Sequence, residues 1–139
     1  MKLINSLNLD GEVIFTEAVS EEDLRAYYSN AECFVLLSLY EGLGFPPLEA
    51  MACGCPVITP DSSSLPEVVG EVAIKIPPHN TEKLTGALRE VLTNRQLRES
   101  LIAKGTGQAA KFSWEQTAEK TLEVYKEVEE QIQGMVNFL

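Results

Sequence analysis

Residues 41–49 read Glu41-Gly42-Leu43-Gly44-Phe45-Pro46-Pro47-Leu48-Glu49, a glycine-containing loop with a carboxylate at each end that leads into a predicted helix. A carboxylate accepts hydrogen bonds from sugar hydroxyls, glycine lets backbone N–H groups approach a ligand, and a helix start offers donors to an anion. With 21 acidic residues in 139, the spacing of the two carboxylates alone carries no weight. The loop favours a polyhydroxyl ligand only together with its glycines, its prolines and its flanks.

The flanks predict a strand before the loop and a helix after it. Residues 33–38 are a short apolar run typical of a buried parallel strand, and the pair Pro46-Pro47 fits a first helical turn, where no N–H is needed. Gly54 ends this helix, and a second apolar strand follows at residues 55–60. The loop therefore lies at the carboxyl end of a strand in a βαβ unit, which is where open α/β sheets bind ligands.

Residues 41–58 resemble the donor-binding signature of retaining glycosyltransferases with the two-Rossmann-domain (GT-B) architecture, the family called group 1 or family 4. Residues 13–16, 64–70 and 112–115 are similar to further landmarks of that family in the same order. The resemblance implies an α/β fold, a Rossmann-like open parallel sheet with flanking helices that is the incomplete carboxyl-terminal half of a GT-B fold. Residues 1–139 would form a single partial nucleotide-sugar-binding domain, with 114–133 as its terminal helix.

The resemblance also implies roles for individual residues. Glu41 would be the catalytic-site residue that contacts the transferred sugar and orients it, and Glu49 would hold the ribose hydroxyls of the nucleotide. Backbone N–H groups of the glycine loop would contact the sugar and the diphosphate, and the region that begins at Thr16 would flank the base. The implied donor-binding set is Glu41, Gly42, Leu43, Gly44, Phe45, Glu49, Thr16, Ser63 and Ser64.

The serine-rich stretch 60–66 allows two interpretations. Its hydroxyl and N–H groups could face the donor phosphates, or Ser64 and Glu67 could form a capping box for a short helix. Residues 63–67 are also similar to family members that build mannose-containing polysaccharides, which hints at a GDP-mannose donor. Other helix caps are predicted at Ser20, Asn80 or Thr81, Asn94 and Ser113.

Three departures from the family pattern affect the predicted site. Glu17 stands where the family commonly has glycine, and Lys75 places a charge in an otherwise apolar run. The chain also begins where the family's carboxyl-terminal domain is already under way, without its first two strands and the acceptor-binding domain.

Residues 26–74 contain no Lys or Arg although they include six acidic residues. Because a nucleoside diphosphate is itself anionic, we expect the chain alone to bind a donor poorly and to catalyse nothing.

Composition excludes several classes of protein. A net charge of −10 argues against nucleic acid or an anionic membrane surface as a partner, and no apolar run approaches membrane-spanning length. We expect the protein to be cytoplasmic, or bound to the membrane surface through the amino-terminal domain of the family, which is not matched here.

Cys53 and Cys55 have no second Cys or His cluster with which to form a metal site, and His79 is predicted to lie in a surface loop or a cap. Without an Asp-x-Asp cluster we expect no metal and no cofactor, since the nucleotide sugar is a substrate.

The resulting prediction is the donor-binding part of an enzyme that transfers a hexose from GDP-mannose or a UDP-sugar to a saccharide or lipid-linked acceptor with retention. A non-catalytic nucleotide-sugar-binding or assembly subunit and a GT-B-type sugar-nucleotide epimerase remain the alternatives. The predicted partners are the donor, the acceptor and the lacking amino-terminal domain or a partner chain. Residues 13–15, predicted as a strand, would leave an open sheet edge through which the chain could self-associate.

Overall fold

The computed structural model describes residues 2–136, and the side chains up to residue 134. Its parallel sheet contains β1 (Phe34–Val35), β2 (Val57–Pro60) and β3 (Ile74–Ile76) in the order β1-β2-β3. The helices are α1 (Lys2–Ser6), α2 (Glu21–Asn30), α3 (Phe45–Ala52), α4 (Leu65–Val69), α5 (Thr81–Thr93), α6 (Arg95–Ala109) and α7 (Trp114–Val136). This architecture confirms the predicted α/β class.

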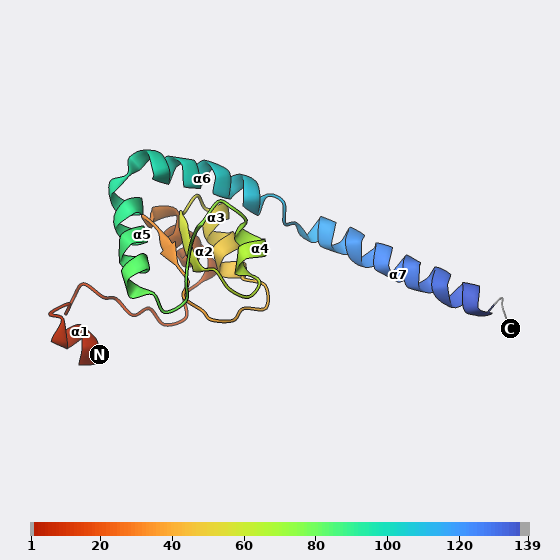
Figure 1. Cartoon of the computed structure of the whole chain (residues 1–139), viewed down its shortest axis with the longest axis horizontal. Coiled ribbons are helices and arrows are strands. Elements are labelled where there is room, and N and C mark those ends of the chain that lie inside the picture. Colours follow the sequence, from red (N-terminus) through yellow and green to blue (C-terminus); the bar gives the residue numbers. More distant parts are fainter. Residues whose placement is uncertain (1, 137–139) are drawn as a thin grey trace.

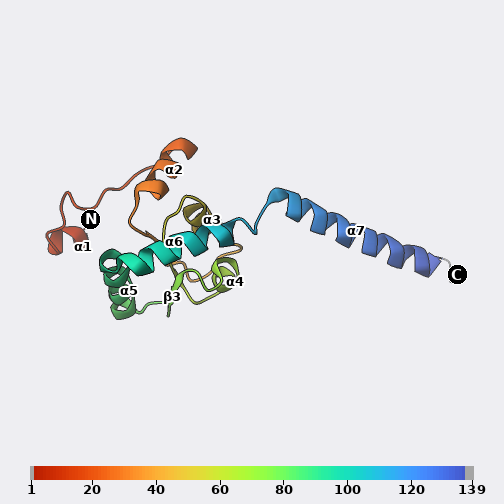
Figure 2. The same cartoon turned by 90° about the horizontal axis from the view of Figure 1, so that it is seen from above.

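Helices cover both faces of the sheet (Figures 1 and 2). Successive residues of a strand point to opposite faces. Val57 of β2 accordingly packs with Tyr28 of α2 and Met51 of α3, whereas Ile58 packs with Val91 of α5 and Leu101 of α6. All four residues of β2 are buried, as expected of the central strand of a parallel sheet covered on both sides.

Four predicted helix caps are confirmed. The side chains of Ser20, Asn80, Asn94 and Ser113 each accept a hydrogen bond from the backbone N–H three residues later, at 2.9–3.2 Å. The capping box predicted for Ser64 is wrong, because Ser64 has helical backbone angles (φ −76°, ψ −15°) and its side chain makes no cap hydrogen bond. A capping residue needs an extended backbone, and the Ser64 hydroxyl is instead directed to the loop after β1.

The strand predicted at residues 13–15 is also wrong. Val13, Ile14 and Phe15 lie in an irregular segment with exposed fractions of 41%, 83% and 67%. A strand needs a neighbour to pair its backbone groups, and the described sheet offers none to this segment. The open edge proposed for these residues therefore does not exist in this form.

Helix α7 points away from the sheet and the other helices (Figures 1 and 2). Its apolar side chains at positions 122, 124, 125, 128 and 132 are all about half exposed or more. The predicted start of this helix at residue 114 is confirmed. Within residues 2–136, no helix is long and apolar enough to cross a membrane.

Candidate functional site

The loop that carries Glu41 begins at the carboxyl end of β1 and is hydrogen-bonded to the loop after β2. The Ser63 hydroxyl accepts a hydrogen bond from the backbone N–H of Glu41 at 3.2 Å and donates one to its carbonyl oxygen at 2.8 Å. The Ser64 hydroxyl lies 2.9 Å from the same carbonyl oxygen and 3.2 Å from that of Leu43. Two serines thus hold the backbone of the Glu41 loop against the neighbouring strand's loop.

A rare backbone conformation brings these serines into place. Ser63 has a φ of +57°, in the left-handed region that few residues other than glycine adopt. The Ser62 hydroxyl lies 3.4 Å from the carbonyl oxygen of Leu39. Three successive hydroxyls, at positions 62–64, therefore contact the segment that follows β1. The donor-binding prediction for Ser63 and Ser64 is not tested by these contacts, but their hydroxyl protons are directed to the protein backbone.

Gly44 connects the Glu41 loop to α3. Its φ is +96°, and a Cβ atom at this position would lie 2.8 Å from Cδ2 of the buried Leu65. Both properties require glycine here. Because Pro46 and Pro47 carry no N–H, the donors left at the start of α3 include the backbone N–H groups of Gly44 and Phe45. Within the described residues, no hydrogen bond is recorded for these two groups.

Glu49 lies in α3 after the two prolines and is an exposed residue. The Tyr28 hydroxyl of α2 lies 3.4 Å from its Oε2 atom. Burial, with a smaller contribution from the Glu49 charge, raises the pKa of Tyr28 to about 12. The tyrosine is therefore a neutral hydrogen-bond donor to this carboxylate at physiological pH.

Two cavities meet at Glu49. The first, of 430 Å³, lies between α2 and α3 and is lined by Leu24, Arg25, Tyr28, Glu49, Ala52 and Cys53 among others. The second, of 440 Å³, lies between α3 and the start of α7. Its walls include Phe45 and Trp114, whose ring centroids are 6.3 Å apart. Glu49 is thus placed to contact a ligand in either cavity, whereas Glu41 lines neither.

The remaining predicted site residues have a less defined setting. Gly42 and Leu43 are exposed in the loop between Glu41 and Gly44. Thr16 is exposed in the irregular segment before α2 and lines neither cavity at Glu49. The structure therefore brings together Glu41 and the serines by direct contact, joins Glu49 to them through α3, and leaves Thr16 apart from these contacts.

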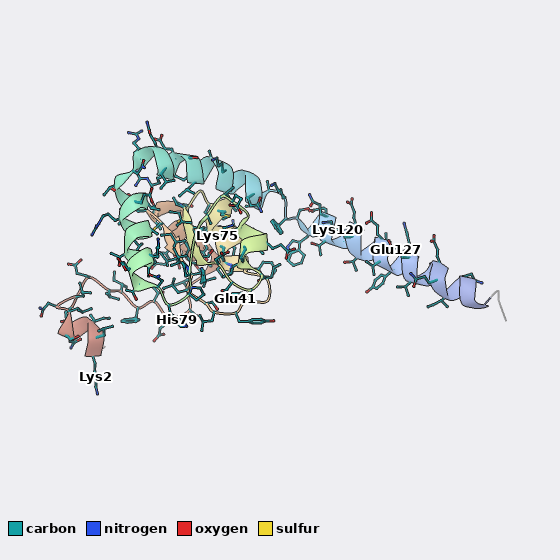
Figure 3. All side chains as sticks on the ribbon, viewed as in Figure 1. Lys2, Glu41, Lys75, His79, Lys120 and Glu127 are labelled. Carbon is teal, nitrogen blue, oxygen red and sulfur yellow. The ribbon has the colours of Figure 1, made fainter. Side chains whose placement is uncertain are left out.

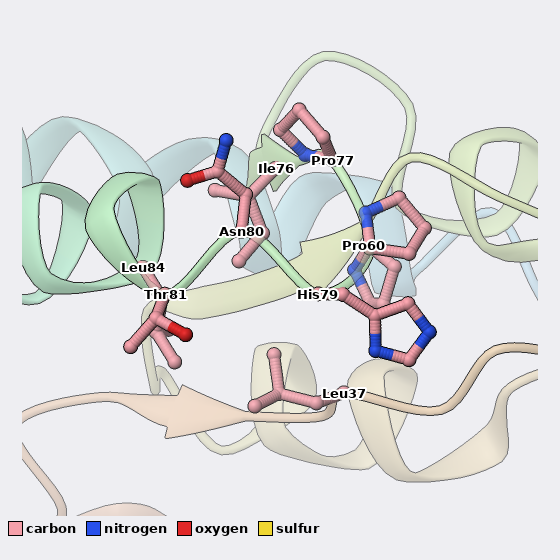
Figure 4. A pocket seen from close by; sticks show the side chains of 9 residues that line it. Leu37, Pro60, Ile76, Pro77, His79, Asn80, Thr81 and Leu84 are labelled. Carbon is pink, nitrogen blue, oxygen red and sulfur yellow. The ribbon is translucent and has the colours of Figure 1, made fainter.

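A smaller cavity of 110 Å³ lies at the carboxyl ends of all three strands (Figure 4). The imidazole ring of His79 lies beside Pro60, and the side chain of Leu37 faces the same space. In Figure 3, Glu41 and His79 lie on the same side of the molecule, away from α6. His79 is exposed in a loop with a φ of +62°, which confirms the predicted surface position.

Ion pairs remove some of the negative charge that the sequence places in residues 26–74. Glu32 pairs with Arg98 of α6, and Glu71 pairs with Lys75 at 2.6 Å. The second pair explains how β3 accommodates a lysine in an otherwise apolar run. Arg25, the residue just before the stretch without Lys or Arg, lines the same cavity as Glu49. The site therefore has one cationic side chain of its own at the rim of that cavity.

Cys33, Cys53 and Cys55 are free thiols. Burial raises the pKa of Cys55 to about 11, so this thiol stays protonated and unreactive. In the part of the chain that the structure describes, no group of three or more His, Cys, Asp or Glu residues is arranged to hold a metal ion.

Sequence reasoning missed the contact between Tyr28 and Glu49. The helical spacing in residues 21–30 places Leu24, Tyr27 and Tyr28 on one face and predicts that all three turn inward. Only Tyr28 is buried, at 7% exposure, while Tyr27 is 55% exposed. Tyr27 and Tyr28 lie three and four residues after Leu24, and both spacings place a residue on the same helix face, so the sequence held no signal that singles out Tyr28.

Comparison with known proteins shows relatives along most of the chain. The family model described as "Glycosyl transferases group 1" matches residues 1–108. The O-antigen chain mannosyltransferase B of Escherichia coli is 37% identical over 90% of this chain and 33% of its own length. An MMP alpha-(1->4)-mannosyltransferase of Mycolicibacterium hassiacum is 36% identical over 90% of this chain and 31% of its own. The chain therefore spans about a third of the length of these relatives.

Solved structures agree with this assignment. A sucrose-phosphate synthase from Thermosynechococcus elongatus superimposes with a TM-score of 0.83 at 30% identity, over 94% of this chain and 33% of that one. HepE from Anabaena, solved in complex with UDP-glucose, superimposes with a TM-score of 0.82 over 91% of this chain and 35% of its own. Its identity of 18% makes it a likeness of fold alone.

Proposed function

Because this chain belongs to the glycosyl transferases group 1 family, we propose that it is the donor-binding part of a retaining glycosyltransferase. The reaction moves a hexose from a nucleoside-diphosphate sugar to a saccharide or lipid-linked acceptor. Two mannosyltransferases among the relatives support GDP-mannose as the donor, and a UDP-sugar is the alternative. The roughly two thirds of the relatives that the chain does not match would supply the acceptor site.

The observation that carries this proposal is the pair of loops at the carboxyl ends of β1 and β2. Hydrogen bonds from Ser63 and Ser64 fix the backbone of Glu41. A fixed backbone allows Glu41 to orient a sugar, which is the contribution that positioning makes to catalysis. In this proposal both serines act on the ligand chiefly through the loop that they hold, and Glu41 is not a nucleophile.

The leaving diphosphate gains negative charge during the transfer and needs preorganised donors. The N–H groups of Gly44 and Phe45 at the start of α3 serve this purpose. A helix end contributes only about 0.3–1 kcal/mol at an exposed position, so cationic side chains are also needed. Arg25 is one candidate from this chain, and we propose that further cations come from the acceptor-binding part.

The proposal assigns no metal or cofactor to the chain. The nucleotide sugar carries its own leaving group, the diphosphate. The backbone N–H groups and the cationic side chains named above act directly on this diphosphate. Glu49 binds the ribose hydroxyls, because an exposed carboxylate accepts hydrogen bonds from a diol. Thr16, Gly42 and Leu43 complete the proposed donor-binding set.

Binding of nucleotide sugars by the 139-residue chain tests the proposal. Chemical-shift titrations with GDP-mannose and with UDP-glucose detect affinities down to the millimolar range. We expect Glu41→Gln to weaken sugar-dependent binding and Glu49→Gln to weaken binding of both donors, by roughly tenfold, as for hydrogen bonds to a charged group. Glu90→Gln, in an exposed position of α5, is the matched control. Equal affinities for all four proteins would refute the proposed site.

A further inference from the structure

We infer that Tyr28 is a positioning residue for Glu49, holding its carboxylate at the cavity between α2 and α3 in the orientation that binds the ribose diol. This inference rests on the proposed function, in which Glu49 binds the ribose. It adds a residue that is 21 positions away in sequence and lies on a different helix. No catalytic step is assigned to Tyr28 itself.

The tyrosine ring is fixed by its surroundings. Tyr28 is 7% exposed and belongs to the core cluster that contains Met51 and Val57. Its ring meets that of Phe34 edge to face, with centroids 5.4 Å apart and an interplanar angle of 86°. A ring packed in this way cannot change rotamer without disturbing the core. Its hydroxyl oxygen therefore has a fixed position, 3.4 Å from Oε2 of Glu49.

The glutamate, by contrast, is exposed and has no such packing. A free glutamate side chain on a helix surface samples several rotamers, and ordering it on binding costs free energy. The Tyr28 hydroxyl stabilises one of these rotamers before the ligand arrives. A carboxylate has about four acceptor sites, so one hydrogen bond from Tyr28 leaves enough sites for two ribose hydroxyls.

The cavity itself fits this arrangement. Tyr28 and Glu49 line it from opposite helices, and Leu24 and Ala52 provide apolar wall beside them. Arg25 also lines this cavity. The chain also provides an internal control: Tyr27, the adjacent residue of α2, is 55% exposed and lines another surface.

The first experiment checks the contact without a ligand. Ionisation of the tyrosines is followed by absorbance at 295 nm, over the pH range in which circular dichroism shows a folded chain. Since the Glu49 charge helps to raise the pKa of Tyr28, Glu49→Gln should make this tyrosine ionise at lower pH. Tyr28→Phe should remove the late-ionising group, and Tyr27→Phe should leave it. An unchanged late ionisation in Glu49→Gln would overturn the inference.

The second experiment measures discrimination for the ribose hydroxyls. GDP and its 2′,3′-dideoxy analogue are titrated into the wild-type chain, Tyr28→Phe and Tyr27→Phe, and the ratio of the two affinities is compared. Tyr28→Phe should reduce this ratio by about three- to tenfold, as expected for one hydrogen bond, and leave binding of the dideoxy nucleotide unchanged. Tyr27→Phe should keep the wild-type ratio. A purely structural role would weaken both nucleotides equally and would overturn the inference.

Glu49→Gln separates this inference from the proposed function. If the wild-type chain does not distinguish the two nucleotides, or if Glu49→Gln leaves their ratio unchanged, the ribose role of Glu49 is wrong and the inference fails with it. If Glu49→Gln abolishes the discrimination while Tyr28→Phe preserves it, the proposed function stands and only the role of Tyr28 is wrong.

Discussion

The hydroxyl group of Ser63 is hydrogen-bonded to both backbone polar groups of Glu41, accepting from the N–H at 3.2 Å and donating to the carbonyl oxygen at 2.8 Å. The two residues are 22 positions apart and follow different strands of the sheet. Beyond the end of β1, the Ser63 side chain thus makes the hydrogen bonds that the backbone of a paired strand would otherwise make. The position of the Glu41 backbone depends on these two hydrogen bonds.

Ser63→Ala should therefore loosen the Glu41 loop. We expect a loss of about 1 kcal/mol in unfolding free energy, typical of a hydrogen-bonded hydroxyl, and faster amide hydrogen exchange at Glu41. Ser63→Gly should show the same faster amide exchange at Glu41, because it also removes the hydroxyl, although glycine adopts the left-handed backbone without strain. Ser62→Ala is the matched control, because the hydrogen bond of the Ser62 hydroxyl goes to the carbonyl oxygen of Leu39 and not to Glu41. Unchanged exchange at Glu41 in both Ser63 variants would contradict the prediction.

Gly44→Ala should destabilise the chain by about 1–3 kcal/mol, the cost of a non-glycine residue in a strained conformation. The added Cβ would meet Leu65 in a backbone with a φ of +96°. Gly42→Ala is the control, since its added Cβ would have no heavy atom within 4 Å and its φ is not positive. Urea unfolding curves of the two variants measure the difference. Equal midpoints would show that the loop rearranges at Gly44 without cost.

Stability should fall at high pH. The unfolded pKa of a tyrosine is 10.0 and that of folded Tyr28 is about 12, so in this interval the folded chain keeps a proton that the unfolded chain releases. The stabilisation is complete below pH 10 and is lost as the pH rises through the folded pKa. Cys55, with a pKa raised to about 11, adds a second contribution of the same sign.

Thermal unfolding between pH 8 and pH 11.5, roughly spanning these pKa values, measures this loss. Tyr28→Phe should make the decline shallower without abolishing it, because the contribution of Cys55 remains. Tyr27→Phe should decline like the wild-type chain. A Tyr28→Phe chain with the wild-type slope would show that Tyr28 ionises normally when folded.

The isolated chain should bind GDP-mannose with a Kd of about 0.1 mM or weaker, since residues 26–74 supply no Lys or Arg to a dianionic diphosphate. Calorimetry at low and high salt measures this affinity. Replacing the matching third of the Escherichia coli O-antigen chain mannosyltransferase B with this chain should raise it, if the rest of that relative supplies cations. Micromolar binding by the isolated chain would disprove the charge argument.

Local signals in the sequence were sufficient for much of this fold. The caps at Ser20 and Asn94 depend on a side chain and an N–H three residues apart, so they could be predicted without knowledge of the fold. The strands of the βαβ unit could be predicted from apolar runs, and the start of α3 from its two prolines. The Glu41 loop could be placed because strand order fixes where such loops lie.

Features that depend on distant parts of the chain could not be predicted. Ser64 matched a capping pattern, but the loop containing Glu41 competes for its hydroxyl from 23 residues away. Residues 13–15 have a strand-like composition, but a strand also needs a neighbour to pair with. Tyr28 and Tyr27 look alike in sequence, and only the packing of α2 against Phe34 distinguishes them.

The sheet order β1-β2-β3 follows the order of the strands in the chain. Each strand pairs with the next strand to be synthesised, and a single helix separates the two partners in the sequence. Proteins built from such sequence-local units can fold while translation continues, because no strand needs a partner from the far end of the polypeptide. Strands β1, β2 and β3 can therefore pair on the ribosome before α7 has left the exit tunnel, and their core is completed once α5 and α6 supply Val91 and Leu101.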